Sequence, residues 1–174
     1  MKDILDAIRK AIKDKNWYGA LFISLTLPDI CGKIENPNFL SEKRYKDWFN
    51  KYMSAKYIYG DRTFLSSDDC YAFRCVLLHE GSDDIAGQKS RKILEKFLFM
   101  TSGPHCNYMQ NNYVNGQRVK TSLQLRVDKF CEDICDSVEQ WLKDTSTDTA
   151  IMNRVHETIK IYEPGTVYGG IKIS

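Results

Sequence analysis

Residues 71–78 are apolar at seven of eight positions, and the exception is Arg74. A guanidinium stays protonated, so inside such a segment it needs an anionic partner or a polar cleft. The serines and aspartates at 66–69 favour a helix start, and Gly81 favours a helix end. We therefore expect a largely buried helix that carries a permanent positive charge and ends near His79.

Arg74 and His79 allow two interpretations. In the structural one, Arg74 forms an ion pair with Asp29, Glu35 or Asp69, and His79 caps the helix C-terminus. In the functional one, both open onto one cleft, where a fixed cation and a group that titrates near neutral pH suit chemistry on a phosphodiester. Five residues turn a regular helix about 140° past one full turn, so convergence needs a frayed helix end or a dimer axis.

Length and composition set broad limits. The 174 residues predict one domain over residues 1–174, with 43% hydrophobic and 28% charged residues. The formal net charge of +2 provides no strong field that would by itself predict nucleic-acid binding. No apolar run approaches the roughly 18 residues of a membrane span, and the mixed-charge N-terminus does not resemble a signal peptide. We expect a cytoplasmic protein with no membrane partner.

Apolar spacing predicts a mainly α fold. Pro28 is expected to kink or split the second helix because proline lacks a backbone donor. Residues 93–100 fit either a helix or a strand, and residues 54–65 fit a loop. The expected helices cover residues 3–15, 17–35, 41–52, 67–79, 127–143 and 148–159.

The C-terminal half carries a β signal. Asn115-Gly116 separates two polar-alternating runs and is typical of a hairpin turn. The tail at 160–174 is expected to be extended and to form a small sheet with this hairpin. The predicted layout is a helical core at 3–80 and 127–159, a hairpin region at about 105–125, and the tail.

The six cysteines include no Cys-x-x-Cys pair. We expect buried free thiols, which behave as small hydrophobic groups. A zinc site built from His105, Cys106, Cys131 and Cys135 is the alternative, but its spacing matches no structural zinc pattern. The prediction is therefore no metal and no cofactor.

Three sequence blocks carry a family resemblance: residues 27–32 (LPDICG), 43–52 (KRYKDWFNKY) and 69–81 (DCYAFRCVLLHEG). Arg74-x4-His79 in the third block looks like the Arg-x4–6-His motif of the HEPN superfamily, and the three blocks in order resemble a bacterial and plasmid-borne HEPN-like group. The resemblance implies a HEPN-like helical bundle. It also implies a homodimeric, metal-independent endoribonuclease in a toxin-like or phage-defence role, with an RNA substrate and a possible antitoxin or regulatory partner.

The resemblance also implies residue roles. Arg74 would hold the scissile phosphate, and His79 would handle the proton of the attacking 2′-hydroxyl or the leaving 5′-oxygen, giving a 2′,3′-cyclic phosphate. Cys75 stands where active members usually carry Asn or Asp, and a thiol donates only weakly. Asp69 could orient the guanidinium instead, and Asp29 is a further supporting candidate.

Candidate RNA contacts are Arg44, Arg118 and Lys120. The last two lie in a polar, aromatic segment that could contact single-stranded RNA by stacking and hydrogen bonding. Alternatively, this segment is a plain exposed hairpin. For Asp29, the alternatives are an ion pair with Arg44 or Arg74, or the start of a helical segment after Pro28. The competing function is a non-catalytic HEPN-like module that binds RNA or protein.

Overall fold

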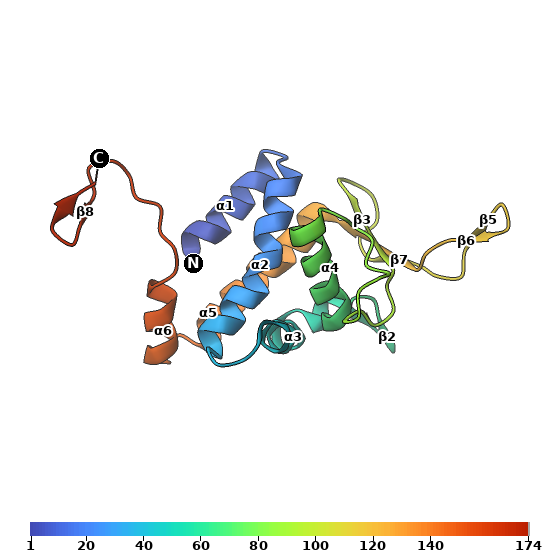
Figure 1. Cartoon of the computed structure of the whole chain (residues 1–174), viewed down its shortest axis with the longest axis horizontal. Helices are drawn as coiled ribbons and strands as arrows, with labels where there is room; N and C mark the ends of the chain where they lie inside the picture. The colour runs from blue at the N-terminus through green and yellow to red at the C-terminus, as the bar shows by residue number, and fades with distance from the viewer. Residues whose placement is uncertain (174) are drawn as a thin grey trace.

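The computed structural model describes residues 1–173 and is mainly α-helical (Figure 1). The strands form one three-stranded sheet and three separate hairpins, and each strand of these hairpins is two residues long. The helices are α1 (Lys2–Lys13), α2 (Trp17–Glu35), α3 (Ser41–Tyr52), α4 (Ser67–Glu80), α5 (Val127–Asp144) and α6 (Thr149–His156), with a 3-10 turn at Ser54–Tyr57. The strands are β1 (Ile58–Tyr59), β2 (Arg62–Thr63), β3 (Lys96–Met100), β4 (Asn107–Met109), β5 (Tyr113–Val114), β6 (Gln117–Arg118), β7 (Ser122–Arg126), β8 (Val167–Tyr168) and β9 (Ile171–Lys172).

Helix α2 lies at the centre of the bundle and packs against α1, α3 and α5 (Figure 1). Asn16 caps its start by accepting a hydrogen bond from the Gly19 amide at 3.1 Å. Of the two outcomes expected at Pro28, the split does not occur, because α2 is continuous from Trp17 to Glu35. Pro28 is itself buried, and burial of both halves of α2 outweighs one missing backbone hydrogen bond. Within residues 1–173, no helix combines the length and apolar character needed to cross a bilayer.

Helices α2 and α3 approach closely at Gly32. A Cβ atom on Gly32 would lie 2.6 Å from the backbone carbonyl oxygen of Arg44, and backbone cannot move aside as a flexible side chain can. This contact sets the distance between α2 and α3, and both helices supply residues to the candidate site described below.

We expect Gly32→Ala to lower the free energy of unfolding by about 2 kcal/mol, because the steric overlap exceeds the gain in helix propensity. Urea denaturation followed by circular dichroism measures this loss. Gly87→Ala is the matched control, since a Cβ on Gly87 meets nothing within 4 Å. Equal stability of the two variants would contradict the close approach of α2 and α3.

The main sheet has the strand order β3-β7-β4, with β3 parallel and β4 antiparallel to β7. The Phe97 side chain on β3 is fully buried and stacks on Phe73 of α4, with ring centroids 4.4 Å apart. Leu123 and Leu125 of β7 are also fully buried. The sequence of residues 93–100 fits either a helix or a strand, and this packing favours the strand that the structure shows at Lys96–Met100.

The turn at Asn115-Gly116 is present, with positive φ angles of 51° and 76° at the two residues. The paired strands beside it are only two residues long, and the sheet pairing resumes between β4 and β7. In Figure 1 this hairpin projects from the right end of the molecule. The expected loop at 54–65 instead contains a 3-10 turn and the β1–β2 hairpin.

The C-terminal segment differs from the expectation. Helix α6 ends at His156, earlier than the predicted 159. Strand β8 pairs with β9 rather than with the main sheet, because positive φ angles at Gly169 and Gly170 let the chain reverse on itself. The β8–β9 hairpin lies away from the helices, at the left of Figure 1. The predicted sheet between hairpin and tail is therefore wrong for the described residues.

Candidate functional site

Arg74 on α4 forms an ion pair with Asp29 on α2, with 3.2 Å between Nη2 and Oδ2. The other carboxylate oxygen of Asp29 accepts a hydrogen bond from Nε of Arg44 on α3 at 2.6 Å. The hydroxyl of Ser41 donates to Oδ2 of Asp29 at 3.0 Å. One carboxylate therefore joins three helices, and Asp29 pairs with both arginines that the sequence offered as alternatives. We call Asp29, Ser41, Arg44 and Arg74 the Asp29 cluster.

The Asp29 cluster holds two cations against one anion in a mostly buried position. The side chains of Arg74, Arg44 and Asp29 are 19%, 18% and 13% exposed. Within residues 1–173, Nε of Arg74 is buried without a hydrogen-bond partner, and Nη1 reaches only Sγ of Cys75, at 4.0 Å. The cluster therefore keeps one net positive charge, which favours an anion bound at the exposed part of Arg74.

His79 lies in the last turn of α4 and is exposed. In the described part of the chain its imidazole has no hydrogen-bond or ion-pair partner. The helix end is instead capped through the backbone: Gly81, at a φ of 65°, donates its amide to the carbonyl of Leu77 at 3.1 Å. The imidazole is therefore accessible to solvent or to a ligand.

Arg74 and His79 flank the least buried stripe of α4. Tyr71, Arg74, Cys75 and Leu78 are half-buried, and His79 is exposed. At 100° per residue, Leu78 and Cys75 fall between Arg74 and His79 around the helix axis. The two residues therefore border one surface, about 140° apart, and a single chain does not by itself bring their functional groups together.

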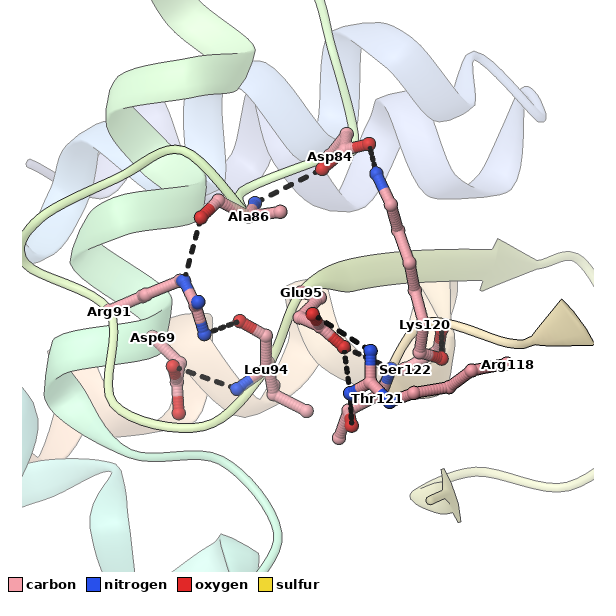
Figure 2. A network of polar contacts seen from close by, with 10 residues as sticks. All are labelled: Asp69, Asp84, Ala86, Arg91, Leu94, Glu95, Arg118, Lys120, Thr121 and Ser122. Carbon is pink, nitrogen blue, oxygen red and sulfur yellow. Dashed lines mark hydrogen bonds and ion pairs between the residues drawn. The ribbon is translucent and has the colours of Figure 1, made fainter. Parts of the chain in front are cut away.

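Asp69 has a different role from the one that the sequence suggested. Asp69 as a residue is 3% exposed, and its Oδ1 accepts hydrogen bonds from the amides of Lys92, Ile93 and Leu94 at 2.7, 3.1 and 3.2 Å. Oδ2 accepts from the Ser66 hydroxyl at 2.7 Å. Figure 2 shows the bond to Leu94. Asp69 anchors the segment before β3 and does not orient Arg74, because it lies on the buried face of α4.

Arg118 and Lys120 are also occupied by carboxylates (Figure 2). Arg118 forms two hydrogen bonds to Glu95, at 3.2 and 2.7 Å, and with the Thr121 amide it lowers the pKa of Glu95 to about 2. Lys120 donates a hydrogen bond to the carboxylate of Asp84, and this contact lowers the pKa of Asp84. These cations fasten the segment between α4 and β3 to the sheet, so their charge is largely compensated. Their contact with RNA stays a prediction.

The residues of the alternative zinc site are not assembled. Within residues 1–173, no group of three or more His, Cys, Asp or Glu side chains is placed to hold a metal ion. Cys131 and Cys135 are buried in α5, and burial raises the pKa of both, like that of Cys106, to about 12. Nε2 of His105 lies 3.6 Å from Oδ2 of Asp133, and its Nδ1 accepts a hydrogen bond from the Arg126 amide at 3.1 Å, so both ring nitrogens have protein partners.

Sequence reasoning missed Ser41, which it interpreted only as a helix start. It also missed Lys33 and Arg154, which line a pocket beside Asp29. Neither cation stands in a motif. Arg154 lies 120 positions from Ile34, whose carbonyl accepts a 2.6 Å hydrogen bond from it, so no local pattern could have indicated this contact.

No family model, curated protein or solved structure matches this chain. The HEPN resemblance therefore rests on the three blocks at residues 27–32, 43–52 and 69–81. The structure places them on α2, α3 and α4. Each block supplies one charged member of the Asp29 cluster: Asp29, Arg44 and Arg74.

Proposed function

We propose that this chain is a metal-independent endoribonuclease of HEPN type that acts on cytoplasmic RNA as a homodimer, in a toxin-like or phage-defence role. The observation that carries the proposal is the half-buried stripe of α4, bordered by Arg74 on one side and His79 on the other. The Asp29 cluster adds support, since it holds a partly unpaired guanidinium at this stripe.

A second copy of the chain can complete the site. If two α4 helices pack antiparallel across a two-fold axis between Cys75 and Leu78, then Cys75 of each copy faces Leu78 of the other. The same register brings Arg74 of one copy level with His79 of the second copy along the helix axis, and the long arginine side chain must cross the seam to reach it. The apolar side chains of Tyr71 and Leu78 would supply contact area for this packing.

The chemistry follows from the two groups. Arg74 binds the non-bridging oxygens of the scissile phosphate, while Asp29 holds the guanidinium from the other side. The 2′-oxygen attacks phosphorus, and the bond from phosphorus to the 5′-oxygen breaks. His79 accepts the proton of the 2′-hydroxyl or supplies one to the leaving 5′-oxygen. The products are a 2′,3′-cyclic phosphate and a 5′-hydroxyl.

Mixed dimers test the composite site. Arg74→Ala and His79→Ala chains should each be inactive, yet their co-expressed mixture should recover about one quarter of wild-type cleavage of single-stranded RNA in EDTA. The reason is that half of the dimers are mixed, and each mixed dimer has one intact site of two. A mixture of His79→Ala with His79→Gln is the control and should recover nothing. Absence of recovery in the first mixture, with active wild-type protein, would exclude a site shared between copies.

One observation favours a non-catalytic module as the second candidate. Asp29 already neutralises part of the charge of Arg74, and His79 stands apart from it in the single chain. In that case the α4 stripe binds RNA or a regulatory protein, such as an antitoxin, without reaction. RNA binding by wild-type protein without any cyclic phosphate product would favour this candidate.

A further inference from the structure

A pocket of about 400 Å³ lies between the C-terminal part of α2, the start of α3 and α6. This volume is within the range of small-molecule sites, roughly 300–1,000 Å³. Ile30, Ile34 and Pro37 give the pocket an apolar part. Lys33, Arg44 and Arg154 bring three cations to it from three different helices.

Arg154 is fixed by one edge of its guanidinium. Its Nε donates to the carbonyl oxygen of Ile34 at 2.6 Å, which holds the side chain of α6 against the end of α2. Within residues 1–173, Nη1 and Nη2 of Arg154 have no hydrogen-bond partner. A guanidinium already held in place loses little conformational entropy when it binds a ligand.

Arg44 is fixed in a similar way. Its Nε donates to Asp29 at 2.6 Å and its Nη1 to the carbonyl of Phe39 at 3.1 Å. In the described chain, Nη2 has no partner. Two oriented guanidiniums therefore line one pocket with donors to spare, the arrangement that suits a phosphate or carboxylate.

The charge of the pocket limits the ligand. Asp29 and Glu157 also line it, so the cations outnumber the carboxylates by one. Asp29 is moreover shared with Arg74, which lies outside the pocket. A ligand with a single phosphate group fits this excess better than a polyphosphate, and the apolar part can accommodate an organic body.

We propose that this pocket binds a small organic monophosphate of mononucleotide size. Its phosphate lies on Arg44 and Arg154, and its organic part lies against Ile30, Ile34 and Pro37. The proposal goes beyond the ribonuclease function, because it needs neither His79 nor a second copy of the chain.

Isothermal titration calorimetry at low salt tests the proposal with AMP, adenosine and inorganic phosphate as probes. AMP should bind at least about tenfold more tightly than either of the other two, since it alone offers both the phosphate and the apolar body. Single-stranded RNA should not displace it. AMP binding no tighter than that of inorganic phosphate, or displacement by RNA, would overturn the assignment of a monophosphate pocket.

Variants separate the pocket from the rest of the surface. Arg154→Gln should weaken AMP binding at least about tenfold. Lys33→Gln should weaken AMP binding too, because it removes another cation of the pocket. This variant keeps the bond between α6 and α2, so it remains a test if Arg154→Gln folds poorly. Arg62→Gln removes an exposed arginine of β2 and should change nothing. Equal weakening by Arg62→Gln would refute the site. His79→Ala should bind AMP as wild type does, so failure of the ribonuclease proposal remains distinguishable.

Discussion

Replacement of His79 by alanine is expected to lower the rate of RNA cleavage in EDTA at least about 100-fold, because general acid–base catalysis contributes roughly 10²–10⁴ to such rates. The side chain is exposed and lies in the last turn of α4, so its removal leaves the packing of the helix intact. Stopped reactions on a single-stranded RNA, resolved by end-group analysis, measure both the rate and the cyclic phosphate product.

His156→Ala is the matched control for this prediction. His156 is also exposed in the last turn of a helix, but on α6 rather than on the stripe of α4. The His156→Ala variant should cleave RNA as fast as the wild-type protein. If His79→Ala retains full cleavage while its circular dichroism spectrum is unchanged, His79 is not the proton-transfer group, and the proposed mechanism fails.

Asp69→Ala is expected to lower the free energy of unfolding by about 4 kcal/mol, since it leaves four donors without their acceptor at once. The carboxylate holds three consecutive backbone amides, of Lys92, Ile93 and Leu94, together with the Ser66 hydroxyl. The Asp69 side chain and its bond to the Leu94 amide are buried, so water cannot readily replace that bond. Urea denaturation measures the loss, and amide hydrogen exchange at residues 92–94 should accelerate.

Asp68→Ala supplies the comparison. Asp68 is the neighbouring carboxylate, 39% exposed, with an ion pair to Lys46 at 2.7 Å. Its loss should cost less than about 1 kcal/mol, as is usual for surface ion pairs. Asp69→Asn keeps an acceptor for the three amides, so its loss of unfolding free energy should lie between those of Asp68→Ala and Asp69→Ala. A similar loss for Asp68→Ala and Asp69→Ala would show that the anchored segment contributes little to stability.

Local signals in the sequence were sufficient for most helices. Ser66 accepts a hydrogen bond from the Asp69 amide at 3.1 Å, and Gly81 ends the same helix in the left-handed conformation. Both features need only neighbouring residues, so they could be predicted. The continuity of α2 through Pro28 could not be predicted, since burial of the surrounding residues compensates for the lost hydrogen bond.

The candidate site was only partly predictable. The sequence singled out Arg74 as a charge that needs a partner, and it offered three carboxylates. It could not show that Asp29 is that partner, nor that Arg44 shares it, because these contacts span 45 and 15 positions. The assignment of Asp69 to Arg74 failed because the rotation around α4 and the position of residues 92–94 decide which groups it meets.

The sequence by itself determined the mainly helical fold, the cap and end of α4, the turn at Asn115-Gly116, and the presence of a permanent charge in an apolar helix. Apolar periodicity, capping and turn chemistry act over a few residues, which is why they can be read from the chain. Only the tertiary structure decided the partner of Arg74, the pocket that Arg154 completes, and the separation of the β8–β9 hairpin from the sheet. These depend on how whole elements pack, because the energy of burying one surface is shared among residues far apart in sequence.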